Sequence, residues 1–453
     1  MIYVGVIIAL SLASYWRVLT FTFWKDDWFL LWGAIHDSSA FRAYWAHPGT
    51  VVEFMWLTRL FGARPLLWNI VGLGLHIGVA LVLALCVREF TRSKRAAKTS
   101  GLLYAVSVAG MDAVGWPSAH VVLWVSLFLL VGLYYYFRKH TALSLLYIFL
   151  ALFSDPFRAG PIIFIYPGFV LVALATVPFF WPYIMGSQLM THISLYVHNP
   201  MEVLRKIYVI GNYFNSLAHV FFGWIVPFRE DGSTGVYNPI WARVGFLLLG
   251  IGLLYRKNMK VFILLLWIGI FYIPNWLFEP RLTMGVTHRY MAISELGFVA
   301  ILSYVLSLVK NQTVFYMLLV ILLVSNIAMT NYYALLAAPY RTATKVNALW
   351  DGINRNVPEN MSPLLFSYFG EDPVKLYALS LSGAYPFAIA RGITHFSNIP
   401  IVSEDSGYIQ KLVCQDTVPL NHVYAWNVTN KGTMTDVTSA WRRLISGGCT
   451  KNR

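Results

Sequence analysis

Long apolar runs dominate this chain from its N-terminus to about residue 331. A helix needs roughly 20 apolar residues to cross a bilayer. About eleven runs are read as membrane-spanning helices, with approximate bounds, and the third and fifth of them are short. They lie near residues 2–23, 66–87, 99–115, 119–137, 141–155, 160–183, 207–227, 241–256, 261–278, 290–309 and 313–331. Hydrophobic residues make up 58% of the chain and charged residues 12%, whereas soluble domains carry about 25% charged residues. The predicted fold class is therefore an all-α polytopic membrane protein.

Basic residues gather in the short connections between these runs. If the first helix runs from inside to outside, they fall on one side of the membrane, which the positive-inside rule makes cytoplasmic. No basic segment precedes the run from Ile2 to Leu19, so we expect a retained first helix rather than a signal peptide. Topology then accounts for the net charge of +14, and no nucleic-acid partner is expected. The residues concerned are Arg88, Arg92, Lys94, Arg95, Lys98, Arg138, Lys139, Arg205, Lys206, Arg256, Lys257, Lys260 and Lys310.

The longer and chemically more varied segments fall on the opposite side. Residues 24–65 are rich in aromatic side chains, which predicts one or two amphipathic helices at the membrane interface. Residues 332–453 mix strand-like and helix-like runs with nearly balanced charge, which predicts a small extracytoplasmic α/β domain. We therefore divide the chain into a transmembrane domain, 1–331, and a C-terminal domain, 332–453. The expected location is the cell (plasma) membrane, with the N-terminus in the cytoplasm.

Two residues inside apolar runs, Cys86 and His76, are expected to be packing residues. Cys414 and Cys449 both lie in the C-terminal domain. They could form a disulfide if that domain lies in an oxidising compartment.

Two adjacent carboxylates, Asp26 and Asp27, directly follow the first apolar run. One interpretation is a solvated pair at a helix end, with Lys25 neutralising one acid. The other is a functional site, because charged groups at a membrane boundary are costly. Trp24 and Trp28 would partly desolvate the pair, and burial beside a like charge raises a carboxyl pKa. One of the two acids would then accept a proton near neutral pH.

A candidate anion site opens the tenth predicted helix on the same side. His288, Arg289 and Tyr290 stand at its start, and Arg281 lies shortly upstream. Arg289 could simply anchor the helix at the interface. Its rigid donors beside a helix N-terminus also suit a phosphate group, with His288, Arg281 and Lys25 as further donors.

A third polar segment, from Asp112 through Trp116 to His120, follows the third predicted helix. Alone it reads as a polar turn. Together with Tyr290 and Trp28 it would form another wall of one external cavity. Carboxylates, an Arg site and an apolar groove on one membrane face suit an enzyme that acts on a lipid phosphate.

The order of these motifs resembles the GT-C superfamily of polyprenyl-phosphate-sugar-dependent glycosyltransferases. The branch most similar contains the transmembrane-and-TPR O-mannosyltransferases and their bacterial and archaeal relatives. The likeness covers roughly residues 1–330 and is carried by four stretches. These are the acidic pair, Phe61 to His76 with its final Leu-His, Asp112 to Trp116, which is similar to E-A-V-A-W, and Thr287 to Phe298, which is similar to E-R-Y-L-Y-L-P-S-x-G-F.

The chain departs from the family pattern at several positions. His47-Pro48 stands where an Arg-Pro pair is usual, and Ser154-Asp155-Pro156 stands where Ser-Lys-Glu is usual. His288 replaces a Glu, and no TPR array follows. These departures leave the donor sugar and the acceptor open.

The resemblance implies an inverting hexosyltransferase of the cell envelope that uses a polyprenyl-phosphate sugar donor within the lipid bilayer. Asp26 would be the general base, and Asp27 would support it or bind acceptor hydroxyls. Arg289 would hold the donor phosphate with His288 or Arg281. The acceptor could be a glycan, a lipid or a protein. No cofactor is required, although some GT-C relatives bind a divalent metal beside this acidic loop, so a metal at Asp26 stays open.

Two other functions compete with this interpretation. A transporter or flippase for a lipid-linked glycan predicts charged residues within the membrane and broken helices in paired halves. A non-catalytic assembly protein predicts that Asp26→Asn leaves function unchanged.

Overall fold

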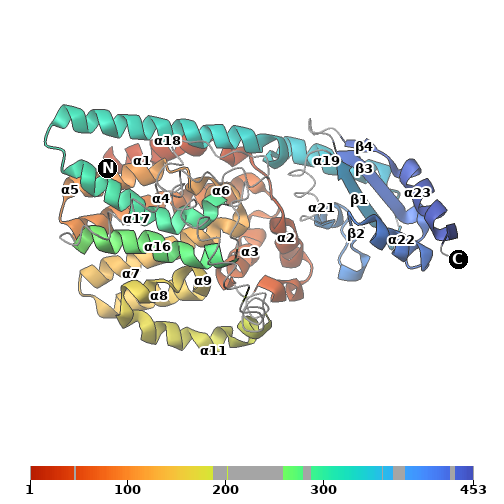
Figure 1. The fold of residues 1–453 in the computed structure, drawn as a ribbon, viewed down its shortest axis with the longest axis horizontal. Coiled ribbons are helices and arrows are strands. Elements are labelled where there is room, and N and C mark those ends of the chain that lie inside the picture. Colours follow the sequence, from red (N-terminus) through yellow and green to blue (C-terminus); the bar gives the residue numbers. More distant parts are fainter. Residues whose placement is uncertain are drawn as a thin grey trace. The chain divides into compact units, whose positions relative to one another are not determined.

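The computed structural model describes residues 2–44, 47–186, 201, 259–278, 287–359, 361–370, 383–428 and 434–451 (Figure 1). The chain forms two compact units. The first contains Met1–Leu19, Arg42–Glu53 and Leu66–Leu336, and the second contains Thr20–Phe41, Phe54–Pro65 and Ala337–Arg453. Residues of the predicted first loop are thus shared between the two units.

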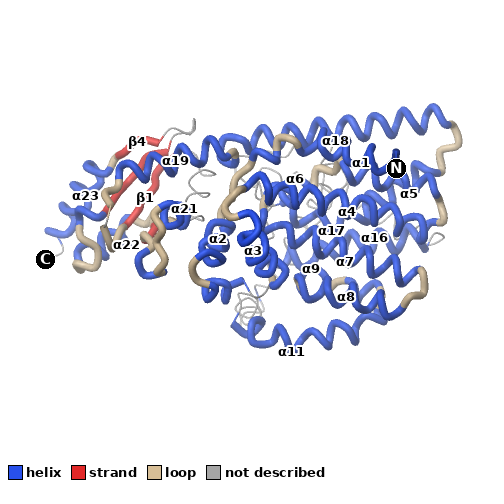
Figure 2. The backbone as a smooth tube through the Cα atoms, turned by 180° about the vertical axis from the view of Figure 1, so that it is seen from behind, coloured by secondary structure: helices blue, strands red, loops and turns tan. Residues whose placement is uncertain are grey.

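The first unit is a bundle of helices in its described part (Figures 1 and 2). Its helices are α1 (Ile2–Tyr15), α4 (Pro65–Thr91), α5 (Lys94–Ala105), α6 (Gly110–Gly115), α7 (His120–Phe137), α8 (Thr141–Ser154), α9 (Pro156–Ala159), α10 (Ile162–Ile165), α11 (Val170–Gly186), α16 (Met259–Phe278) and α17 (Thr287–Ser307). Two further helices, α3 (Pro48–Phe61) and α18 (Gln312–Arg341), begin in this unit. Buried side chains from α4, α5, α7 and α17 contribute to one continuous apolar core.

Several of these helices have the length and composition of membrane spans. Three in the described part meet both criteria, at Pro65–Thr91, Pro117–Phe137 and Gln312–Ala338, and shorter apolar helices accompany them. The predicted runs 207–227 and 241–256 lie outside the described residues. The predicted fold class, a helical polytopic membrane protein with a small C-terminal α/β part, is confirmed.

Prediction of the third run as one helix over 99–115 was wrong. The chain leaves helix α5 at Ala105, turns through residues 106–109, and resumes as α6. A break inside an apolar bundle frees backbone groups that must find partners. The hydroxyl of Thr330 donates to the Val106 carbonyl at 3.3 Å, and the hydroxyl of Tyr15 donates to the Ser107 carbonyl. These side chains therefore stabilise the break.

The sixth predicted run, 160–183, is interrupted as well. The short helix α9 precedes this run, and the chain then passes through α10 and a 3-10 turn at Pro167–Phe169 before α11 begins at Val170. Pro156 begins α9, and Pro167 begins the 3-10 turn. A proline has no N–H to give to a preceding turn, so the chain bends at these points.

The second unit contains a four-stranded sheet in the order β2-β1-β3-β4. Strands β1 (Leu365–Gly370), β2 (Ile401–Val402) and β3 (Val423–Val428) are parallel, and β4 (Met434–Asp436) runs antiparallel to β3. Because side chains alternate along a strand, Phe366 and Trp426 face a core with α19 (Ala343–Asn356) and α21 (Tyr385–Ala390). On the other face, Leu365 and Val423 pack with α22 (Ser406–Cys414) and α23 (Thr438–Lys451) (Figure 1).

Helix α2 (Asp26–Ile35) packs within this second unit against α21. The indole N–H of Trp32 donates to the Ile393 carbonyl at 2.7 Å, and the rings of Phe29 and Tyr385 meet edge to face at 5.2 Å. The segment that carries the acidic pair is therefore held by aromatic contacts with the C-terminal fold.

Cys414 on α22 and Cys449 on α23 form a disulfide that spans 35 residues. A cross-link of this length removes chain entropy from the unfolded state, and a native disulfide contributes about 2–4 kcal/mol.

We expect Cys449→Ser to lower the free energy of unfolding by about that amount. The measurement is thermal unfolding of the full chain in detergent. Reductant should shift wild type to the level of the variant and leave the variant unchanged; a wild type that is insensitive to reductant would contradict the prediction.

Candidate active site

The two acids at the start of α2 have different surroundings. Asp27 is fully buried, and its Oδ2 accepts the backbone N–H of Trp24 at 2.9 Å. This bond ties the carboxylate to the chain just before the helix. Asp26, the first residue of α2, is half-buried. Of the predicted catalytic pair, Asp26 is the more accessible acid and Asp27 is built into the helix start.

Two cations lie close to this helix start. Lys25 is buried in a left-handed conformation with φ 50°, and its Nζ lies 4.0 Å from the centroid of the Trp24 ring. Arg341, at the end of α18, is fully buried, with its guanidinium 4.6 Å from the same ring and 4.7 Å from that of Phe21. Cations over aromatic faces are attracted by the ring quadrupole. The acidic pair therefore shares its surroundings with two buried positive charges.

Arg341 was missed by the sequence analysis. The backbone N–H of Thr22 donates to the Arg341 carbonyl at 2.7 Å, and Phe21 forms a bridge with Thr342. The segment before the acidic pair is thus joined to a residue more than 300 positions later. The available signal was an isolated Arg just after the last apolar run, on the same predicted side as Asp26.

The predicted phosphate residues lie largely outside the described part. Arg281 is not among the described residues, and the side chains of His288, Arg289 and Tyr290 in the first turn of α17 are not described. A cavity in which Asp26 faces Arg289 stays a prediction. Trp28 is half-buried and meets Phe23 edge to face at 5.4 Å.

In the first unit, the predicted residue His120 forms a buried pair with Glu53. The ring Nδ1 lies 2.7 Å from Glu53 Oε1, and the indole of Trp124 donates to Oε2 at 3.1 Å. The ring Nε2 lies 3.2 Å from the Val114 carbonyl. Both ring nitrogens of His120 therefore have a hydrogen-bond partner inside the protein.

A glycine makes room for this pair. A Cβ on Gly72 would lie 2.5 Å from His120 Nε2 and 2.5 Å from the Val114 carbonyl oxygen. Only a residue without a side chain allows α4 to pass so close. Asp112 and Trp116, predicted with His120 as a cavity wall, are both buried on the same short stretch. Glu53 was missed; its signal was a single acid within an otherwise apolar helical run.

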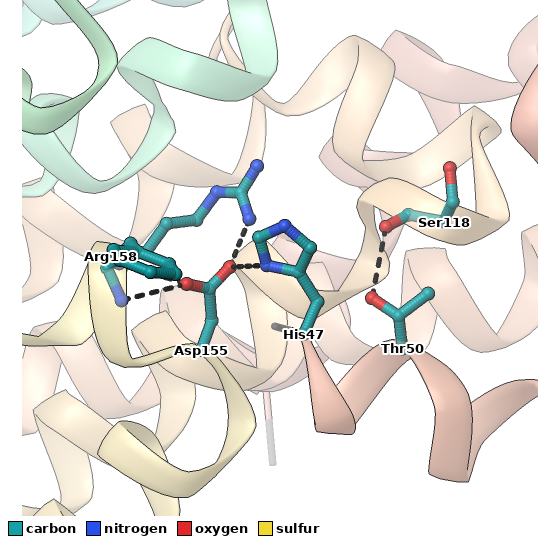
Figure 3. A network of polar contacts seen from close by, with 6 residues as sticks. His47, Thr50, Ser118, Asp155 and Arg158 are labelled. Carbon is teal, nitrogen blue, oxygen red and sulfur yellow. Dashed lines mark hydrogen bonds and ion pairs between the residues drawn. The ribbon is translucent and has the colours of Figure 1, made fainter. Parts of the chain in front are cut away.

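A second polar network joins the start of α3 to the turn after α8 (Figure 3). His47 Nδ1 lies 2.9 Å from Asp155 Oδ2, and Arg158 binds the same oxygen. The backbone N–H groups of Phe157 and Arg158 donate to the other oxygen at 3.1 and 3.0 Å. Asp155 is fully buried, whereas the His47 side chain is 33% exposed. His47 and Asp155 are two of the departures from the family pattern, and the structure brings them into contact.

These contacts determine the charge of Asp155. Burial opposes its ionisation, but the Arg158 guanidinium, His47 and the backbone N–H groups together hold the pKa of this carboxyl well below its usual range. Asp155 is therefore an anion at neutral pH. The close approach of the two segments depends on Gly49, where a Cβ would lie 3.0 Å from the Ser154 Cβ.

No metal centre emerges from the described part of the chain, where no group of three or more His, Cys, Asp or Glu side chains could hold a metal ion. Beside Asp26, one Asp27 oxygen accepts the Trp24 N–H, and Lys25 precedes the pair. A divalent metal at Asp26 stays a prediction.

Comparison with known proteins gives one structural likeness. No family model matches the chain, and no curated protein matches it. Among solved structures, it is similar to the crystal structure of ArnT from Cupriavidus metallidurans in the apo state. The likeness covers 94% of this chain and 92% of that one, at 15% sequence identity and a TM-score of 0.44.

Asp155→Asn should destabilise the protein, because it leaves Arg158 buried without its anion. Loss of one partner of a buried ion pair costs about 3 kcal/mol or more. The folded-state pKa lies below the unfolded value of about 3.9, so this stabilisation is present above about pH 4 and is lost as the pH falls further. Thermal unfolding of wild type and variant should therefore differ at pH 7 and converge in acid.

The exposed Asp351→Asn provides the matched control, because it makes the same chemical change away from the network. A wild type and an Asp155→Asn variant that unfold with equal stability at pH 7 would contradict the assignment of a stabilising Asp155 anion.

Proposed function

We propose that the chain is a GT-C-type membrane glycosyltransferase. It transfers a sugar from a polyprenyl-phosphate donor to an extracytoplasmic acceptor, with inversion at the sugar carbon. The observation that carries the proposal is the acidic pair of α2, in which Asp27 is buried and bonded to the backbone while Asp26 stays accessible. The motif order along residues 1–330 adds the expectation of a lipid-phosphate donor.

In this mechanism Asp26 accepts the proton of an acceptor hydroxyl as that oxygen attacks the sugar carbon. Asp27 holds the helix start and so positions its neighbour. Arg289, with His288 or Arg281, binds the donor phosphate and stabilises the charge that develops as it leaves. The proposed orientation has the N-terminus in the cytoplasm and the C-terminal domain outside the plasma membrane.

Asp26→Asn should reduce sugar transfer by about 10²-fold or more, because an amide cannot accept the proton. Purified protein in liposomes with polyprenyl-phosphate sugars and lipid or peptide acceptors provides the assay. Asp37→Asn, in the segment that follows α2, is the matched control and should transfer normally. A wild type without transfer from any donor would overturn the proposed function, and full transfer by Asp26→Asn would overturn the assigned base.

One observation favours the transporter as a second candidate. Glu295 on α17 is buried, and its carboxylate accepts the Ser107 hydroxyl at the break between α5 and α6. A buried acid at a broken helix is a feature of substrate and proton pathways in transporters.

Movement of a fluorescent lipid-linked glycan across liposomes separates the two functions. If the protein is a glycosyltransferase, the wild type should move the glycan no faster than it moves across protein-free liposomes. The Glu295→Gln variant should show the same slow rate. Rapid movement by wild type and Asp26→Asn, abolished in Glu295→Gln, would establish the transporter instead.

A further inference from the structure

A second cluster of polar side chains lies where the turn after α8 meets the start of α3. It does not include Asp26 or Asp27. His47, Asp155 and Arg158 converge there, and Figure 3 shows the imidazole and the guanidinium meeting at the same carboxylate. Four donors surround Asp155: His47 Nδ1, the Arg158 side chain and two backbone N–H groups. These four donors to Asp155 all belong to the protein. The imidazole of His47 is therefore the group of this cluster that can meet a ligand.

The hydrogen bond to Asp155 determines which atom His47 presents. An anionic carboxylate only accepts, so Nδ1 carries the hydrogen. The other ring nitrogen, Nε2, has no hydrogen-bond partner among the described residues, and the side chain is 33% exposed. A carboxylate behind an imidazole holds its orientation and stabilises the imidazolium, as in catalytic dyads.

The charges around the ring suit an anionic ligand. Asp155 and Arg158 neutralise each other, so a protonated His47 carries the net positive charge of the cluster. The rings of Tyr44 and Phe157 lie 6.5 and 6.4 Å from the imidazole, centroid to centroid. The guanidinium Nε of Arg158 is a further buried donor without a hydrogen-bond partner in the described part of the chain. The imidazole therefore has donor capacity left for a phosphate oxygen.

We propose that His47 is the general acid of the transfer reaction, protonating the phosphate oxygen that leaves the sugar, with Asp155 as its positioning residue. The inference rests on the proposed function. The acceptor oxygen forms a bond to the sugar carbon while the bond from that carbon to the phosphate oxygen breaks. The electron pair of the broken bond stays on the phosphate oxygen, which takes the Nε2 proton. The acceptor proton passes through the general base of the proposed function to solvent, and solvent returns a proton to His47.

Chemical labelling tests the site without depending on catalysis. Diethyl pyrocarbonate acylates the free nitrogen of a neutral imidazole, and peptide mapping identifies the residue modified. His47 should react, and polyprenyl phosphate should protect it, whereas the neutral polyprenol should not. Exposed His140 serves as the unprotected control, and buried His120, with both nitrogens hydrogen-bonded, should stay unlabelled. Protection by inorganic phosphate as well would show that the phosphate group alone is recognised. Labelling of His47 that is unchanged by polyprenyl phosphate would overturn the proposal.

Two variants at His47 separate proton donation from charge. His47→Gln should lower kcat by about 10²-fold, while donor KM changes little. His47→Arg keeps a positive charge, the one usual at this position in the resembling family, but holds its proton at all working pH values. It should bind the donor and still show the kcat defect. Full activity of His47→Arg would overturn proton donation.

Asp155→Asn should lower kcat, as His47→Gln does. The kcat of the double variant should be no lower than that of His47→Gln alone. Additive losses would overturn the positioning role. Because labelling does not need turnover, a wild type that is labelled and protected but transfers no sugar would count against the proposed function and not against the phosphate site.

Discussion

Polar groups within the helical unit must find partners inside the protein, because a bilayer offers no water to replace them. This constraint is visible at several places in the described part of the first unit. At the break after α5, the hydroxyls of Tyr15 and Thr330 donate hydrogen bonds to the carbonyls that the break frees. Glu53 has His120 and Trp124, and Asp155 has His47 and Arg158. Chemically useful groups are thus held in place by the same bonds that make their burial tolerable.

The two polar networks of the first unit differ in what they leave free. In the His120–Glu53 pair both ring nitrogens are occupied and the side chain is fully buried, so the pair suits a structural role. In the His47–Asp155 pair one nitrogen is bound and the ring is partly exposed. The residues at positions 47 and 155, which both depart from the family pattern, are thus the two partners of a single interaction. Loss of Asp155 would leave the buried Arg158 without its anion, whereas loss of His47 would leave Asp155 paired with Arg158.

Much of the fold was predictable from local patterns. Apolar runs located helices such as α4, α7 and α18, and the α/β character predicted for residues 332–453 appears as strands such as β1 and β3 with their covering helices. The candidate site was less accessible to such reasoning. Arg341 lies beside Trp24, and Glu53 lies beside His120. No periodicity links residues so far apart, and each of these residues alone looks like an ordinary isolated charge.

The sequence by itself determined the class of protein, because runs of some 20 apolar residues are long enough to cross a bilayer as helices. It also located the acidic pair, since adjacent charges at the end of an apolar run are conspicuous without any structure. The tertiary structure decided which acid is accessible, where an apolar run breaks, and which distant residues meet. Those outcomes depend on the pairing of buried polar atoms across helices, and that pairing is settled only when the helices pack.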